Sequence, residues 1–187
     1  MLRRAPTPRH GRSWLRRGLL PVGIALFAGA ACNRAPAAVD PVLPPDVGVV
    51  TRVVDGDTLR LRLARRHETV RLIGIDTPES VRPRAPVECF GREAARRLRS
   101  LVPPGTQVRL ERDVELRDRY DRLLAYVFRR RDGLFVNEAL ARDGFARTAT
   151  IPPNQAYVDR FVDAVTDARA AERGLWHACR HDERGPP

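Results

Sequence analysis

Three short polar segments interrupt the hydrophobic pattern of this 187-residue chain: residues 55–58 (DGDT), 71–79 (RLIGIDTPE) and 118–122 (DRYDR). Taken singly, each has an ordinary structural explanation, namely hairpin-turn chemistry, an Asx turn before a proline, and a solvated run of charges. Taken together, they supply aspartates, arginines and a glutamate in the numbers that one kind of phosphoryl chemistry requires.

That chemistry is the hydrolysis of a phosphodiester beside a cation. Two Asp carboxylates, a backbone carbonyl and water molecules form the hard oxygen site that Ca²⁺ prefers. Two guanidinium groups can fork onto the phosphate oxygens and stabilise the charge of a five-coordinate transition state. A carboxylate beside the attacking water can orient or deprotonate it. The three segments contain all of these groups.

The composition excludes several other chemistries. All 34 basic residues are Arg, so the sequence has no P-loop lysine and no Schiff-base lysine. None of its three Ser lies in a G-x-S-x-G motif, no G-x-G-x-x-G occurs, and the four His and three Cys show no zinc spacing.

The net charge of +11 depends partly on the N-terminal segment. The first 31 residues hold six Arg and no acid, and the other 28 Arg against 23 acids leave +5. That surplus fits a moderate attraction to a polyanion, and a coding preference for Arg explains it equally well.

The N-terminal residues 1–31 are predicted to be an export signal. An arginine-rich stretch precedes the apolar residues 18–31 (GLLPVGIALFAGAA), which are too few to span a bilayer. The pair Arg16-Arg17 is similar to part of a twin-arginine signal. The Pro- and Ala-rich residues 32–46 are predicted to be an extended tether.

Two cleavage outcomes are open. Residues 28–30 form an A-x-A site for ordinary signal peptidase, which would give a soluble secreted or periplasmic protein. Alternatively, Ala30-Ala31-Cys32 resembles a bacterial lipobox, with Gly29 where Leu is usual, and Cys32 would become the lipidated first residue of an envelope protein. The lipid anchor would be the chain's one contact with a membrane.

The cysteine count favours the lipid anchor, because three cysteines leave one unpaired in an oxidising compartment. If Cys32 carries the lipid, Cys89 and Cys179 remain as an even pair. We predict a disulfide between them, with two buried free thiols as the alternative.

Residue patterns predict strands first and helices afterwards. Strands are expected at residues 47–54, 59–63, 69–75, 107–111 and 124–128, with a hairpin at Asp55-Gly56 and a turn at residues 65–67. Helices are expected at residues 91–102 and 137–143, and in a last segment that carries Tyr157, Phe161, Val165 and Ala168 and ends before Gly174. Five strands with three helices predict an α+β fold around a small closed OB-type barrel at residues 47–178, followed by a tail at 179–187.

The ordered motifs of the chain resemble the staphylococcal nuclease (thermonuclease) family. The resemblance covers roughly residues 47–178, which is most of the mature chain. It rests on VVDGDTL (53–59), RLIGIDTPE (71–79), RYDRLLAYV (119–127), VNEALARDG (136–144) and GLW (174–176). It implies an OB barrel with three helices, and a Ca²⁺-dependent enzyme that hydrolyses DNA and RNA with little sequence preference and leaves 3′-phosphate ends. No oligomerisation signal is visible, so a monomer is expected.

The resemblance also implies a metal site, carried over by motif position. Asp57 and Asp76 would be the Ca²⁺ carboxylates, and Thr77 would contribute its main-chain carbonyl. Asp55 would shape the turn rather than bind the ion.

The same motif positions imply the residues that act on the substrate. Arg71 and Arg122 would grip the scissile phosphate, and Glu79 would act on the attacking water. Tyr120, with Arg119 beside it, would stack on or hydrogen-bond to the substrate.

Two residues depart from the family pattern. Asp121 stands where the family usually has Gly, and its charge would weaken polyanion binding or pair with Arg119. Thr150 falls where many members place an aromatic residue at the base-binding wall, a role for which Tyr157 is a possible substitute.

Two functions of other classes stay open beside the nuclease. The first is a nucleic-acid-binding module of the same fold that has lost catalysis, although the full catalytic set is present here. The second is a calcium-stabilised envelope protein with no nucleic-acid role. Incubation of the purified domain with plasmid and RNA, with Ca²⁺ or with chelator, separates the nuclease from both.

Overall fold

The computed structural model describes residues 43–80 and 87–180. The predicted signal peptide, Cys32 and most of the tether and C-terminal tail lie outside the described residues. Within the described part of the chain, no helix combines the length and the apolar character needed to cross a membrane.

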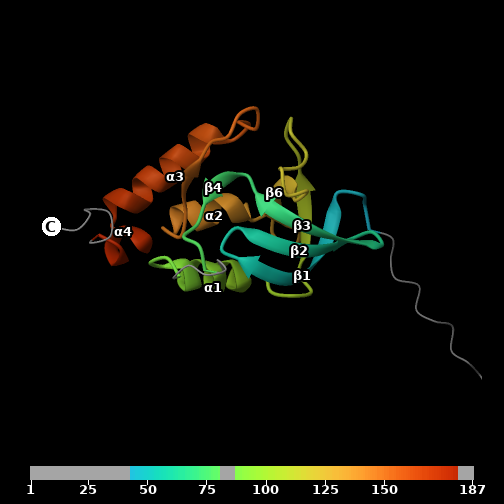
Figure 1. Ribbon diagram of the computed structural model, residues 1–187, viewed down its shortest axis with the longest axis horizontal. Coiled ribbons are helices and arrows are strands. Elements are labelled where there is room, and N and C mark those ends of the chain that lie inside the picture. The colour runs from blue at the N-terminus through green and yellow to red at the C-terminus, as the bar shows by residue number, and fades with distance from the viewer. Residues whose placement is uncertain (1–42, 81–86, 181–187) are drawn as a thin grey trace, which may run out of the picture. The chain divides into compact units, whose positions relative to one another are not determined.

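Five strands close into a barrel, as the alternating pattern predicted (Figure 1). Their order around the barrel is β1-β2-β3-β6-β5, and every neighbouring pair is antiparallel except the parallel pair β3 and β6. The strands are β1 (Val47–Asp55), β2 (Thr58–Leu63), β3 (Arg66–Leu72), β5 (Gln107–Glu111) and β6 (Leu123–Arg129). Alternate residues of these strands point inward, and Leu59, Leu61 and Val70 are fully buried there.

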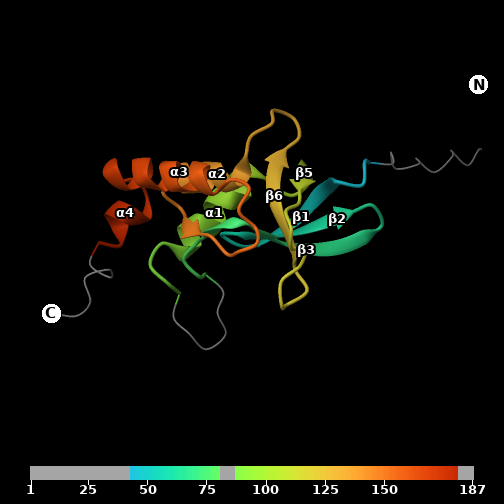
Figure 2. The same ribbon diagram turned by 90° about the horizontal axis from the view of Figure 1, so that it is seen from above.

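The helices gather at one end of the barrel, as both views show (Figures 1 and 2). They are α1 (Gly91–Leu101), α2 (Val136–Arg142), α3 (Val158–Ala170) and α4 (Leu175–Ala178). Leu98, Leu140 and Phe161 from the first three helices belong to the same buried core as the barrel interior. The three predicted helices are therefore present, and α4 is one further turn that the sequence pattern did not predict.

The structure shifts two predicted turns by about one residue. Asp55 is paired with Thr58 across the first hairpin, so the turn consists of Gly56 and Asp57. The second turn lies before Arg66, which already pairs with Leu63 as the first residue of β3.

The predicted strand at residues 69–75 is in fact two elements. β3 ends at Leu72, and a short strand, β4 (Gly74–Asp76), pairs with β7 (Arg147–Ala149) outside the barrel. Gly74 allows this break because its φ is 81°, and because a Cβ there would lie 2.1 Å from the ring of Phe161.

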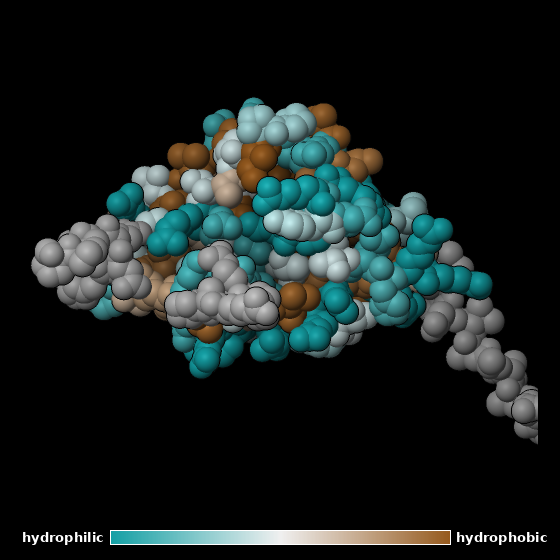
Figure 3. All heavy atoms as spheres, in the orientation of Figure 1, coloured by the Kyte–Doolittle hydropathy of each residue, from teal (hydrophilic) through white to brown (hydrophobic). Residues whose placement is uncertain are grey.

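The surface seen in Figure 3 is mainly hydrophilic. Hydrophobic side chains lie in small groups among hydrophilic ones on this face, without forming one broad patch. This pattern is typical of a surface in contact with water.

Candidate active site

The parallel pairing of β3 with β6 brings two predicted arginines together. Arg71 is the pairing partner of Leu124, and Arg122 directly precedes the first residue of β6. Both arginines line a cleft of about 510 Å³ together with Arg119 and Tyr120. We call these four residues the arginine cleft.

Asp118 holds Arg122 in place within the arginine cleft. The Nε atom of Arg122 donates to Asp118 Oδ2 at 2.7 Å, and its backbone nitrogen donates to Oδ1 at 3.0 Å. Burial raises the pKa of Asp118, but hydrogen bonds from the side chain and backbone of Arg122 outweigh it and hold the pKa below its ordinary value. Because Asp118 binds Nε, the two terminal nitrogens of Arg122 are left to face a ligand in the cleft.

Tyr120 offers an exposed ring at the mouth of the same cleft. Its relative exposure is 64%, and its hydroxyl accepts a hydrogen bond of 2.7 Å from Arg119. The guanidinium carbons of Arg119 and Arg122 lie 4.8 and 5.4 Å from the ring centroid. A ring flanked by two cations suits contact with a nucleotide and its phosphates.

Asp57 fastens the first hairpin turn to the end of β4. Its carboxylate is buried and accepts hydrogen bonds of 3.0 Å from the hydroxyl of Thr58 and from both the hydroxyl and the backbone nitrogen of Thr77. Two predicted metal-binding residues that are 20 positions apart, Asp57 and Thr77, are therefore in direct contact.

Arg71 connects these acids to the arginine cleft. Its Nη2 donates to Asp76 Oδ1 at 2.7 Å, and its Nη1 forms an ion pair with Asp57 Oδ2 that lacks hydrogen-bond geometry. Partial loss of water raises the pKa of Asp76, and Asp57 and Glu88 add to the rise, while the charge of Arg71 opposes it. The two carboxylates thus converge on one positive charge.

This convergence fits the predicted cation. Asp57 and Asp76 offer hard oxygen donors beside Thr77, and a divalent cation would take over the role of counter-ion that Arg71 now has. Among the described residues, no group of three or more His, Cys, Asp and Glu side chains is arranged to hold a metal ion. The fit therefore rests on two carboxylates, a carbonyl and water.

Glu79 lies with Asp55 on the acidic side of Arg71. Asp55 Oδ1 accepts hydrogen bonds from the backbone nitrogens of Gly56 and Ser80, at 2.8 and 3.2 Å, and from the hydroxyl of Ser80. Burial raises the pKa of Asp55, but hydrogen bonding with the side chains of Glu79 and Ser80 and with the backbone of Gly56 and Ser80 brings it below its ordinary value. We call Asp55, Asp57, Asp76 and Glu79 the acidic cluster.

The two departures from the family pattern have clear structural positions. Asp121 has a φ of 62°, in the left-handed region that Gly adopts at low cost, and it pairs with Arg117 at 3.4 Å rather than with Arg119. Tyr157 does not replace the aromatic residue missing at Thr150. Its ring packs against Tyr126, 4.7 Å away between centroids, and its hydroxyl donates to Glu111 rather than facing the cleft.

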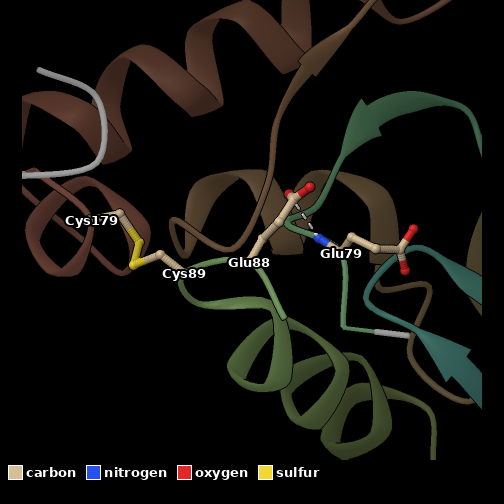
Figure 4. The surroundings of a disulfide bond; sticks show 4 residues. All are labelled: Glu79, Glu88, Cys89 and Cys179. Atoms are coloured by element: carbon tan, nitrogen blue, oxygen red, sulfur yellow. Dashed lines mark hydrogen bonds between the residues drawn. A yellow bond between two sulfur atoms is a disulfide. The ribbon is translucent and has the colours of Figure 1, made fainter. Parts of the chain in front are cut away.

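Two residues that contact the site were not predicted as site residues. Asp118 lies four residues before Arg122, a spacing typical of an ion pair, although a solvated run of charges explains the same segment. Glu88 accepts a hydrogen bond of 3.1 Å from the backbone nitrogen of Glu79, and no local pattern indicates this contact (Figure 4).

The predicted disulfide between Cys89 and Cys179 is present, with a Cα–Cα distance of 5.9 Å (Figure 4). It joins the residue before the N-cap of α1 to the C-cap of α4. The prediction of a bond rather than two free thiols is confirmed.

Comparison with known proteins points in the same direction as this geometry. The family model described as "Staphylococcal nuclease homologue" matches residues 69–178. The chain is 38% identical over 127 residues to a thermonuclease of Staphylococcus hyicus, covering 68% of this chain and 73% of that protein. A thermonuclease of Staphylococcus intermedius is 40% identical over 128 residues, covering 68% and 74%. Endonuclease YncB of Bacillus subtilis (strain 168) is 38% identical over 127 residues, covering 67% and 59%.

Proposed function

The chain belongs to the staphylococcal nuclease homologue family and is a nuclease that hydrolyses phosphodiester bonds, and from this premise we propose its ion, substrates and products. It acts on DNA and RNA with little sequence preference, requires Ca²⁺ and leaves 3′-phosphate ends. The observation that supports this proposal best is the double role of Arg71. This side chain lines the arginine cleft and also contacts Asp57 and Asp76, so a phosphate in the cleft lies beside the acidic cluster.

The two arginines bind the scissile phosphate from the end of β3 and from the residue just before β6. Arg122 is held at Nε by Asp118 and presents its terminal nitrogens, which suits bidentate contact with two phosphate oxygens. Contacts that strengthen as negative charge builds on these oxygens lower the barrier instead of merely tightening substrate binding. The exposed ring of Tyr120 binds beside them without reading the base, because stacking tolerates every base.

Glu79 serves the attacking water. Its carboxylate takes a proton from the water as the water oxygen bonds to phosphorus. The bond from phosphorus to the 5′-oxygen breaks, that oxygen takes a proton from solvent, and Glu79 returns the proton of the water to solvent. The products are a 3′-phosphate and a 5′-hydroxyl.

Asp57, Asp76 and the carbonyl of Thr77 would hold the ion. When bound, Ca²⁺ supplies positive charge that offsets the charge of the phosphate. Mg²⁺ is expected to substitute poorly, because its strict octahedral shell suits this sparse ligand set less well.

The location of the protein belongs to the same proposal. Residues 1–31 direct export, and Cys32 carries a lipid that anchors a monomer to the cell envelope by an extended tether. The disulfide between Cys89 and Cys179 supports an oxidising compartment, where such bonds persist. Labelling with palmitate and partition into detergent test the anchor, and Cys32→Ala should abolish both. Soluble protein beginning at Ala31 would contradict it.

Cleavage assays test the proposed function. The purified full chain is incubated with plasmid DNA and with RNA, in millimolar Ca²⁺ or in chelator, and the product ends are analysed. We expect cleavage of both substrates in Ca²⁺ alone and 3′-phosphate ends. Tight binding of DNA without cleavage in Ca²⁺ would instead identify a binding module.

A further inference from the structure

The main chain of Glu79 is held from the far side of a loop by Glu88. The backbone nitrogen of Glu79 donates to the carboxylate of Glu88 at 3.1 Å, and the backbone nitrogen of Glu88 donates to the carbonyl of Glu79 at 3.0 Å. Figure 4 shows the side chain of Glu79 pointing away from Glu88. The contact therefore fixes the backbone of Glu79 and leaves its side chain to the acidic cluster.

The start of α1 packs closely on the same segment. Gly91 donates to the carbonyl of Glu88 at 3.0 Å, and a Cβ at Gly91 would lie 2.5 Å from the carbonyl oxygen of Glu79. A small displacement at the start of α1 is thus transmitted to Glu79, because no space separates them.

The disulfide ties the segment from Glu88 to Gly91 to the C-terminal helix of the domain, α4. Cys89 directly follows Glu88, and its partner Cys179 ends α4. α4 is itself anchored, because Leu175 is buried and its backbone nitrogen donates to the carbonyl of Gly144 at 2.8 Å. A continuous chain of contacts therefore runs from the end of α2 through α4 and the disulfide to Glu88 and Glu79.

We propose that Glu88 is a positioning residue for Glu79 and that the Cys89–Cys179 disulfide holds it in that position, so that turnover depends on the oxidised state of this bond. The proposal rests on the proposed role of Glu79 in the reaction. It predicts an effect on turnover rather than on substrate binding, because Glu79 acts on the attacking water whereas the arginine cleft binds the phosphate.

Another contact at the same place offers a competing explanation. The ring of Phe90 lies 5.1 Å from that of Phe145, between centroids, and this packing also holds the start of α1. If this packing alone held the start of α1 in place, the disulfide would contribute to stability and not to the position of Glu79. The two explanations differ in what loss of the disulfide does to Glu79 under conditions in which the protein stays folded.

The experiment compares the oxidised full chain with four variants: Cys89→Ser/Cys179→Ser, Glu88→Ala, Glu88→Gln, and a variant that combines Glu88→Ala with both cysteine changes. Hydrogen exchange at the Glu79 amide and steady-state kinetics on DNA are measured at a temperature where circular dichroism shows each protein folded. Glu93→Ala is the matched control, since Glu93 is also an acid at the start of α1 but pairs with Arg96. A further sample of wild type is reduced with a dithiol, which gives two electrons and two protons to the disulfide and itself becomes a disulfide.

We expect the double cysteine variant, the reduced wild type and Glu88→Ala each to lose about 10- to 100-fold in kcat, the scale of a misplaced catalytic group, with KM changed less than about threefold. Exchange at the Glu79 amide should accelerate in all three. Glu88→Gln should retain most of the turnover, because its amide oxygen still accepts the hydrogen bond. Combining Glu88→Ala with the cysteine changes should add little, because both break the same chain of contacts.

Wild-type kcat in the folded double cysteine variant would overturn the proposal, and so would unchanged exchange at Glu79. The proposal would also be overturned if the loss of kcat in the combined variant equalled the product of the losses in Glu88→Ala and in the double cysteine variant. The exchange measurement separates this proposal from the proposed function. If wild type cleaved nothing, the role of Glu79 would fail, while the exchange rates would still show whether the disulfide and Glu88 hold its backbone.

Discussion

The acidic cluster and the arginine cleft are built in different ways, although Arg71 belongs to one and touches the other. In the acidic cluster, Asp55 and Asp57 are buried and receive hydrogen bonds from backbone and hydroxyl groups of neighbouring elements. In the arginine cleft, Tyr120 is mostly exposed, and the loop before β6 is fastened mainly by Asp118.

This difference suggests a division of labour. Groups that act on an ion and a water need fixed positions. Asp55 and Asp57 have them through burial and multiple hydrogen bonds, and the exposed Asp76 is held by its contact with Arg71. Groups that receive a long polymer of varied sequence gain from exposure, because the backbone and any base must reach them. Changes in the acidic cluster should therefore alter turnover and ion dependence, whereas changes at Tyr120 should alter substrate binding.

Arg122→Ala should have the largest effect, because it removes a contact that strengthens in the transition state. We expect kcat to fall by about two to four decades. Asp118→Ala should lower kcat less, since Arg122 remains but loses its support. Arg130→Ala, which removes an exposed arginine outside the cleft, is the control and should keep wild-type kinetics. A loss confined to KM in Arg122→Ala would place this residue with binding alone.

Reduction of the disulfide should have the next largest effect, on stability. The bond closes a loop with a sequence separation of 90, for which the chain-entropy model gives at most about 4 to 5 kcal/mol. Urea unfolding with and without a dithiol measures the difference. An unchanged midpoint would show that the reduced, unfolded chain gains no freedom and that the bond has no stabilising role.

Asp57→Asn should raise the Ca²⁺ concentration needed for half-maximal cleavage by about 10- to 100-fold. The amide oxygen can still accept from Thr77, so the barrel should stay folded, as circular dichroism would check. Asp132→Asn changes an exposed acid that pairs with Arg129 and serves as control. Unaltered Ca²⁺ dependence in Asp57→Asn would remove Asp57 from the ion site.

Asp121→Gly should have the smallest effect, a stabilisation of up to about 1 kcal/mol. Glycine relieves left-handed strain of about 1–2 kcal/mol, and its greater freedom in the unfolded chain offsets part of the gain. Thermal unfolding measures the change. Because one negative charge also leaves the neighbourhood of the arginine cleft, KM for DNA should fall slightly, and a rise in KM would contradict this account of the loop.

The barrel could be predicted from the sequence because its strands have local signals. Residues 59–63 alternate strictly, and a strict alternation has one plausible buried face. The break at Gly74 could not be predicted in this way, because its cause is the ring of Phe161, which approaches from a helix 87 positions later. The single turn of α4 is too short to show a helical period.

The candidate site could likewise be predicted only where local motifs carry it. The motifs carried Asp57, Arg71, Asp76 and Arg122 to positions that the fold brings together. The contact between Glu79 and Glu88 has no counterpart in a local pattern, since it depends on how the loop between them closes. The position of Tyr157 could not be predicted from the sequence, because an aromatic residue on a helical repeat fits a buried cluster as well as a cleft wall.

Glu79→Gln is the sharpest test of the proposed mechanism, because it removes the proposed base and leaves both arginines in place. Turnover and nucleic-acid affinity are measured on the same folded protein in millimolar Ca²⁺. The account predicts a fall in kcat of about two to four decades, the usual scale for a general base, with binding largely retained. Cleavage by Glu79→Gln at the wild-type rate would contradict it.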